Sequence, residues 1–276
     1  MKLLTLNTHS LIEENYETKL KQFVEMVLKE LPDVIALQEV NQSMYAEEAP
    51  SPETYGYMPC EGNEKPVRSD NHVYRVAKML ESYGRNYFWT WIPLKIGYGT
   101  YEEGLAIMSR TPIDDTKEFF ISKIRDYQNW KTRKLLGIRI EDTWYCSVHM
   151  GWWDDDDDPF EVQWEIVDRN LYREEKCVVM GDFNCPAGVP GEGYDYVKIS
   201  GWLDTYELAE KKDDGITVGH VIDGWRERLP EDTSGMRIDY IWSKHPVVVK
   251  SSRVVFNGQN YPVISDHYGI KVVTEE

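Results

Sequence analysis

The sequence lacks the features that mark membrane-spanning, secreted and disulfide-rich proteins. It has no run of about 18 apolar residues, so a transmembrane helix is excluded. The segment from Met1 to Asn7 turns polar too early for the apolar region of a signal peptide, so we expect none. Four cysteines in 276 residues, none of them in a CxxC pair, are too few for a disulfide framework. We therefore expect reduced thiols and a cytoplasmic protein.

Basic residues are also scarce. The chain has 31 Lys and Arg residues against 48 Asp and Glu residues, a formal net charge of −17. Binding to a phosphate backbone requires a positive surface, so this charge disfavours nucleic acid and anionic membranes as partners. The chain is 41% hydrophobic and 29% charged, a composition that supports a large core. No repeat or linker interrupts it, so we expect residues 1–276 to form a single domain.

Hydrophobic periodicity predicts many strands and three helices. Apolar residues recur at steps of three and four over 20–31, 73–80 and 160–171, which predicts helices there. Short apolar or alternating runs predict strands over 2–6, 34–37, 87–91, 105–108, 134–141, 144–148, 177–180, 238–242, 247–255 and 268–273. We expect an α/β (α+β) fold: a four-layer α/β sandwich, with two mainly antiparallel sheets packed face to face and helices outside.

Polar residues recur where these strands begin or end: Asn7, Glu39, His149, Asp182, Asn184, Asp239, Asp266 and His267. A single one is most often a turn former or a helix cap, but ligands bind beyond strand ends in open α/β folds, so the repetition favours one shared site. Carboxylate and amide oxygens suit Mg²⁺ or Mn²⁺ and not zinc. Histidines transfer protons near neutral pH. Such a set suits metal-assisted hydrolysis of a phosphoester.

Seven short motifs stand in order along nearly the whole chain: Thr5-Leu6-Asn7, Leu37-Gln38-Glu39-Val40, the segment from Glu103 to Arg110, Ser147-Val148-His149, Gly181-Asp182-Phe183-Asn184, the segment from Arg237 to Ile241, and Ser265-Asp266-His267. Together they resemble the endonuclease/exonuclease/phosphatase superfamily, which includes pancreatic-type deoxyribonuclease, apurinic endonucleases, inositol-phosphate 5-phosphatases and neutral sphingomyelinases. The resemblance implies a Mg²⁺-dependent phosphoesterase in which Mn²⁺ substitutes.

The resemblance also implies roles around the metal and the phosphate. Glu39 is then the main metal ligand, with Asn7 and Asp266 assisting. Asp182 orients or deprotonates the attacking water. Asn184 holds a phosphoryl oxygen or a second metal ion.

Two histidines complete the implied site. His267 contacts the scissile phosphate, and Asp239 positions it or shares the role of base. His149 acts as an acid or as a hydrogen-bond donor to the transition state. In some relatives a Tyr-x-Glu feature supports that histidine, and Tyr101 with Glu103 matches it here.

Several segments bear on the substrate. Deoxyribonuclease-type relatives carry an arginine two residues after the metal-binding glutamate, where this chain has Asn41. Trp152 and Trp153 follow the predicted catalytic histidine and are candidates to bind an organic group, whereas Trp89 and Trp91 are more typical of a core. The acidic run Asp154 to Asp158 fits a solvated loop or a cation site. One basic cluster fits either an exposed strand face or a phosphate contact: Lys123, Arg125, Lys131, Arg133 and Lys134.

Three functions remain open from the sequence. The first is a phosphoesterase, more specifically a phosphodiesterase, acting on a small or lipid-like substrate. The second is an endonuclease or exonuclease acting on DNA. The third, a catalytically inactive binding module, is disfavoured because every carboxylate and both histidines of the motifs are present.

Overall fold

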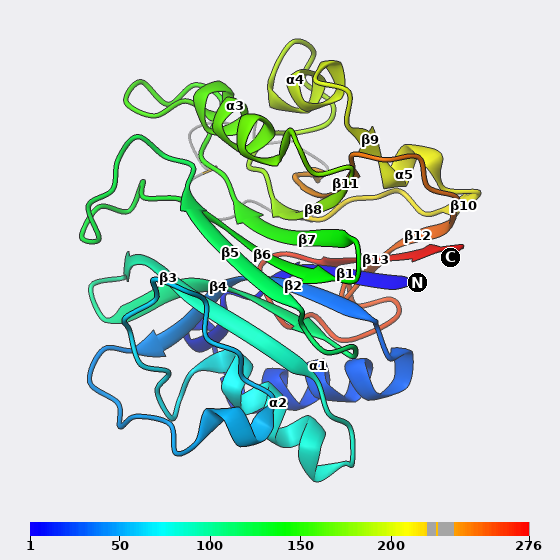
Figure 1. The fold of residues 1–276 in the computed structure, drawn as a ribbon. Helices are drawn as coiled ribbons and strands as arrows, with labels where there is room; N and C mark the ends of the chain where they lie inside the picture. Colours follow the sequence, from blue (N-terminus) through cyan, green and yellow to red (C-terminus); the bar gives the residue numbers. More distant parts are fainter. Residues whose placement is uncertain (220–224, 226–234, 276) are drawn as a thin grey trace.

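Two mixed β-sheets lie face to face at the centre of the computed structural model, which describes residues 1–219, 225 and 235–275 (Figure 1). The first sheet has the order β10 (Lys211–Lys212), β12 (Val249–Val255), β13 (Gly269–Thr274), β1 (Lys2–Asn7), β2 (Val34–Ser43), β4 (Tyr101–Ser109) and β3 (Phe88–Gly97). The second has the order β5 (Asp115–Phe120), β6 (Lys134–Ile140), β7 (Thr143–His149), β8 (Lys176–Asp182), β11 (Asp239–Ser243) and β9 (Leu203–Asp204).

Helices cover the outer faces of both sheets, which completes the four layers that we expected. Figure 1 shows α1 (Tyr16–Glu30) and α2 (His72–Ser82) outside the first sheet, and α3 (Phe160–Leu171) and α4 (Gly193–Ile199) outside the second. The other helical segments are short: two 3₁₀ turns (Ser10–Ile12 and Pro52–Tyr55) and α5 (Thr205–Leu208). No helix in the described part of the chain is long and apolar enough to cross a membrane.

Three buried layers follow from the two-residue period of the strands. In β2, Ile35 and Leu37 point into the core beneath α1 and α2, whereas Val34 and Ala36 point into the core between the sheets. A third core lies between the second sheet and α3, and Trp164 packs there. A strand that is buried on both faces reads as a continuous apolar run, and this explains why these strands could be found from the sequence.

The predicted elements are confirmed with shifted ends. Helix α1 begins earlier than predicted, and β2 continues past residue 37 to Ser43. Trp89 and Trp91 are fully buried in the core, the position that the sequence favoured for them. The prediction missed β5 and α4, because β5 is a half-exposed edge strand without strong alternation and α4 has only seven residues. The pairs β1–β2, β7–β8 and β10–β12 are parallel, and the other pairs are antiparallel.

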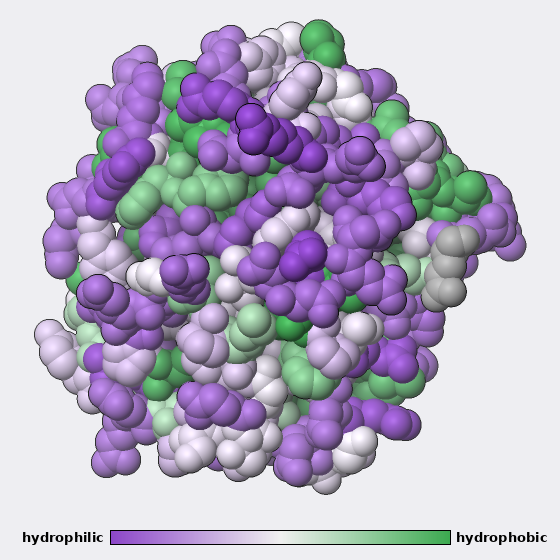
Figure 2. All heavy atoms as spheres, in the orientation of Figure 1, coloured by the Kyte–Doolittle hydropathy of each residue, from purple (hydrophilic) through white to green (hydrophobic). Residues whose placement is uncertain are grey.

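The surface and the cysteines agree with the composition. In the view of Figure 2, hydrophilic side chains cover most of the face, and hydrophobic residues form separate small patches between them. All four cysteines are buried as free thiols, with Cys146 Sγ 4.0 Å from Cys177 Sγ.

Strand register brings three of the predicted site residues together. His149 at the end of β7 is paired with Asp182 at the end of β8, and Asp239 at the start of antiparallel β11 is paired with the same Asp182. In the first sheet, Asn7 at the end of β1 pairs with Gln38. The next residue, Glu39, lies at a register shift between Leu37 and Val40, with φ 50°. The ends of both sheets therefore meet in one place.

Candidate active site

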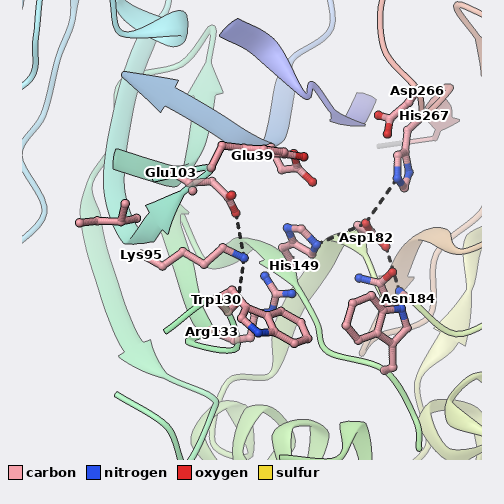
Figure 3. A pocket seen from close by; sticks show the side chains of 14 residues that line it. Glu39, Lys95, Glu103, Trp130, Arg133, His149, Asp182, Asn184, Asp266 and His267 are labelled. Atoms are coloured by element: carbon pink, nitrogen blue, oxygen red, sulfur yellow. Dashed lines mark hydrogen bonds and ion pairs between the residues drawn. The ribbon is translucent and has the colours of Figure 1, made fainter. Parts of the chain in front are cut away.

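A cavity of about 280 Å³ opens where the strand ends of the two sheets meet (Figure 3). Seven residues from the predicted motifs line it: Glu39, Glu103, His149, Asp182, Asn184, Asp266 and His267. Asn7 and Asp239 lie directly behind them. The Asn7 side chain donates to Glu39 at 3.0 Å and to Asp182 at 3.2 Å. The structure thus assembles all eight of the polar residues that the sequence located at strand ends.

Glu39, the predicted main metal ligand, has one carboxylate oxygen without a partner in the described part of the chain. Its Oε1 accepts the Asn7 hydrogen bond, while its buried Oε2 has no hydrogen-bond partner among the described residues. Burial, and then the charges of Glu103 and Asp266, raise the pKa of Glu39 to about 7. A buried carboxylate oxygen without a partner is costly, and a divalent cation would relieve that cost. The donor set of carboxylate and amide oxygens therefore fits a hard ion such as Mg²⁺.

Asp182 occupies the centre of the site. Its Oδ1 accepts the backbone N–H of Asn184 at 2.9 Å, and its Oδ2 lies 3.5 Å from His149 Nε2 and 3.7 Å from His267 Nε2. Burial raises the pKa of Asp182 to about 6, the positive charge of His267 opposes this rise, and the charge of Asp239 adds to it. The carboxylate is therefore ionised at pH 7 and is a stronger proton acceptor than an ordinary aspartate.

The two histidines flanking Asp182 have opposite protonation. Burial alone would lower the pKa of His267, but the charges of Asp239 and Asp182 raise it well above its usual value. The resulting imidazolium donates from Nδ1 to Asp239 Oδ2 at 2.9 Å. Burial lowers the pKa of His149 well below its usual value, and the charge of Arg133 lowers it further. The site thus holds one charged and one neutral imidazole, on either side of a carboxylate.

Asn184 is held in place by the surrounding chain. Its backbone has φ 49°, a conformation that asparagine tolerates better than most residues. The side-chain Nδ2 donates to Met150 O at 2.9 Å, and the Oδ1 accepts from Trp225 Nε1 at 3.2 Å. These two bonds fix the orientation of the amide, and one N–H of its Nδ2 is not used by the bond to Met150.

The remaining predicted residues are distributed differently. Glu103 lines the cavity, but its carboxylate forms an ion pair with Lys95 at 3.1 Å. Trp152 also lines the cavity, whereas Trp153 packs into the core against Phe160 with ring centroids 6.4 Å apart. Tyr101 is half-buried at the start of β4 and is not among the described residues that line the cavity.

Two buried cations that were not predicted to belong to the site also line the cavity. Lys95 is 5% exposed and Arg133 is 3% exposed. Lys95 had a signal, because it is a lone charge inside the apolar strand β3. Arg133 belongs to the predicted basic cluster, for which a phosphate contact was one of two interpretations. Only the fold separates it from Lys123 and Arg125, which are exposed.

The acidic run forms a structured loop at the rim. Asp155 and Asp157 form ion pairs with Lys131 at 2.9 and 2.7 Å. The buried Asp158 accepts the backbone N–H of Ile124 at 3.4 Å. The acidic run and the basic cluster therefore hold two neighbouring loops together.

His9 adds a further charged group beside Asp266. Its Nδ1 lies 2.7 Å from Glu13 Oε1 and 3.9 Å from Asp266 Oδ1. Burial lowers its pKa, but the hydrogen bond to Glu13 and the charges of Asp266 and Glu39 raise it to about 9.

Comparisons with known proteins identify the class of protein to which this fold belongs. The model of the Endonuclease/Exonuclease/phosphatase family matches residues 4–267. A solved family protein from Leptotrichia buccalis is 31% identical over 100% of both chains, with a TM-score of 0.86. The chain therefore belongs to the endonuclease/exonuclease/phosphatase family, whose members hydrolyse phosphoester bonds.

More distant structures share the fold. A 3′ phosphatase from Neisseria, solved with a product DNA hairpin, is 19% identical over 100% of both chains, with a TM-score of 0.64. A mannosyl-6-phosphatase from Bacteroides thetaiotaomicron is 15% identical over 100% of both chains, with a TM-score of 0.63. No curated protein gives a significant match to the sequence.

Proposed function

We propose that this chain is a Mg²⁺-dependent phosphoesterase that hydrolyses a phosphodiester or phosphomonoester bond in a small or lipid-like substrate by in-line attack of water. The observation that carries the proposal is the Asp182 carboxylate, which lies between a charged His267 and a neutral His149 and beside the unsatisfied Glu39. We expect Mn²⁺ to substitute for Mg²⁺ and the enzyme to act in the cytoplasm.

The chain's own residues would divide the chemistry as follows. Asp182 orients the attacking water and accepts its proton, because its pKa of about 6 is close to that of a useful base at neutral pH. His267, held by Asp239, donates to a phosphoryl oxygen as negative charge builds up there. His149 stays neutral and keeps one N–H for donation.

Glu39, Asn7 and Asp266 would hold the metal ion. All three offer oxygen donors, and Glu39 has the buried oxygen without a partner. When bound, Mg²⁺ would neutralise part of the charge on the phosphoryl group. Tyr101 and Glu103 would support the site from β4, with Glu103 acting through its ion pair with Lys95.

Three features favour a small substrate over DNA. The cavity of about 280 Å³ is close to the lower end of the size range of small-molecule pockets. The net charge of −17 repels a polyanion. Asn41 is fully buried where the deoxyribonuclease-type pattern has an arginine, and its backbone N–H donates to Ser10 Oγ at 3.1 Å. Trp152 at the cavity wall would contact the organic part of the substrate. The mannosyl-phosphatase neighbour supports this choice, and the Neisseria 3′ phosphatase, solved with a DNA hairpin, supports the alternative of a DNA substrate.

The test compares small esters with DNA in the same buffers. Hydrolysis of bis(p-nitrophenyl) phosphate and p-nitrophenyl phosphate is measured with Mg²⁺, with Mn²⁺ and with EDTA, beside supercoiled plasmid. We expect metal-dependent cleavage of an ester while the plasmid stays intact, and the ratio of the two rates decides between diester and monoester. Rapid nicking of the plasmid would instead identify a nuclease. Absence of both hydrolysis and Mg²⁺ binding would leave a binding module.

A further inference from the structure

Lys95 and Arg133 form a positively charged side of the cavity. In Figure 3 they lie on one side of His149, while Asp182, Asn184 and His267 lie on the other. Both cations are more than nine-tenths buried. In the proposed function Lys95 contributes only through its ion pair with Glu103, and Arg133 has no role, so the presence of Arg133 requires another explanation.

Only Lys95 has its charge matched by direct contacts. Its Nζ lies 3.1 Å from Glu103 Oε1 and donates to Trp130 O at 2.9 Å. The Arg133 guanidinium forms no ion pair with any described residue, and its buried Nε and Nη1 have no hydrogen-bond partner there. An arginine stays protonated in proteins, so Arg133 is a buried cation with unused donors. Leaving such donors without partners is costly, and an oxyanion would satisfy them.

Carboxylates attract Arg133 from a distance but are engaged elsewhere. Burial lowers its pKa, and the charges of Glu103 and Asp182 oppose that shift. Glu103 already pairs with Lys95, and Asp182 accepts hydrogen bonds from Asn7 and Asn184. The fixed, planar donor pattern of a guanidinium matches a phosphate, sulfate or carboxylate group.

The surrounding loops hold this cationic side in a fixed position. The backbone N–H of Arg133 donates to Ser122 Oγ at 2.8 Å. Lys131, two residues earlier, is paired with Asp155 and Asp157 of the acidic run. The rings of Trp130 and Trp152 lie 5.3 Å apart and join the same two loops. A binding group held in place before its ligand arrives loses little entropy on binding.

We propose that Arg133, together with Lys95, forms an oxyanion-binding subsite for a second anionic group of the substrate, distinct from the phosphoryl group that is hydrolysed. That group is a phosphate, a sulfate or a carboxylate. That this anion is part of the substrate rests on the proposed function. That an anion binds at Arg133 does not depend on it. The substrate is then a small phosphoester with at least two anionic groups.

The first experiment measures anion binding without catalysis. Inorganic phosphate is titrated into the metal-free protein in EDTA by isothermal titration calorimetry. Under these conditions Glu39, Asp182 and Asp266 oppose anion binding on the metal side, but His267 is charged there. The loss of affinity in Arg133→Gln therefore assigns the bound phosphate to the cationic side. We expect one phosphate per chain, with affinity reduced about tenfold or more in Arg133→Gln and less in Arg133→Lys, which keeps the charge but not the planar donor pattern.

The matched control is Arg125→Gln, which removes an exposed arginine from the same loop. It should bind phosphate like the wild type, and circular dichroism should show that all variants are folded. Failure of the wild type to bind phosphate in EDTA would overturn the proposal, and Arg133 would then be a counter-charge for the carboxylates. Equal affinity in Arg133→Gln and the wild type would overturn it as well.

The second experiment tests the substrate and distinguishes the kinds of anion. Three phosphomonoesters are compared. Glucose 6-phosphate carries no further anionic group, 6-phosphogluconate carries a carboxylate as well, and glucose 1,6-bisphosphate carries a second phosphate. We expect Arg133→Gln to raise KM for at least one of the two doubly anionic substrates about tenfold more than for glucose 6-phosphate. An equal fall in kcat on all three would show that Arg133 acts on the scissile phosphoryl group, against the proposal. Arg133-dependent phosphate binding without hydrolysis of these monoesters or of either p-nitrophenyl ester would support the subsite and refute the proposed function.

Discussion

Replacing Asp182 by asparagine should separate catalysis from stability in this protein. The side chain keeps its shape but loses its charge and its ability to accept a proton. The Asp182 carboxylate lies close to both histidines, at 3.5 Å from His149 Nε2 and 3.7 Å from His267 Nε2. If it is the base, Asp182→Asn should lower kcat by about 10²–10⁴-fold, the range that positioned proton transfer typically contributes.

The same substitution should not destabilise the metal-free protein. The pKa of Asp182 is raised from 3.8 to about 6, so keeping this carboxyl ionised in the fold at pH 7 costs about 3 kcal/mol relative to the unfolded chain. Asparagine removes this cost, and it retains an oxygen that can accept the Asn184 N–H. We expect the free energy of unfolding of Asp182→Asn to equal or exceed that of the wild type by up to about 3 kcal/mol at pH 7.

Urea unfolding in EDTA and steady-state hydrolysis of a p-nitrophenyl ester measure the two effects. Because the pKa of Asp182 is raised from 3.8 to about 6, the folded wild type loses stability as the pH rises through that window. The extra stability of the variant should therefore shrink as the pH falls below 6. Activity within tenfold of the wild type would refute the role of base. A clear loss of stability at pH 7 would refute the electrostatic reasoning.

Three further predictions concern other residues. Both Asp182→Ala and His267→Ala should abolish turnover and leave the circular dichroism spectrum of the fold unchanged; near-wild-type activity in either would count against the mechanism. Asp239→Asn should lower the pKa of His267, because it removes the charge 2.9 Å from Nδ1, and an NMR titration of the imidazole that shows no change would contradict this. Burial lowers the pKa of His72 to about 3. The folded protein should therefore lose free energy of unfolding as the pH falls below 6.5, by about 1.4 kcal/mol between pH 7.5 and 5.5. In urea unfolding, the free energy of unfolding of His72→Gln should fall by that much less than the wild type's over the same pH range. An equal fall in both proteins would show that His72 titrates normally.

Local sequence determined the strands and the chemistry at their ends. Runs such as Val34 to Leu37 are apolar on both faces, because each face packs into a different core layer, and this pattern can be read without a structure. The motif from Gly181 to Asn184 combines the end of a buried strand with a turn that brings the Asn184 N–H to the Asp182 carboxylate. Contacts of this kind span two residues and depend little on the rest of the chain.

Long-range register decided how those residues act together. Asp182 lies between two histidines because β8 pairs with β7 on one side and with β11 on the other, which aligns it with His149 and Asp239. No local pattern shows which strands are neighbours, since pairing is decided by the packing of whole sheets. The opposite protonation of the two histidines follows from burial and neighbouring charges and appears only in three dimensions.

The substrate side of the cavity depended most on tertiary structure. Trp152 and Trp153 are adjacent in sequence, yet one lines the cavity and the other packs into the core. Lys95 and Arg133 come from β3 in one sheet and from the loop before β6 in the other. Composition and motifs therefore determined the family and its phosphoester chemistry. The face-to-face packing of the sheets decided which cations were buried beside that chemistry, because it brings together side chains that the sequence keeps far apart.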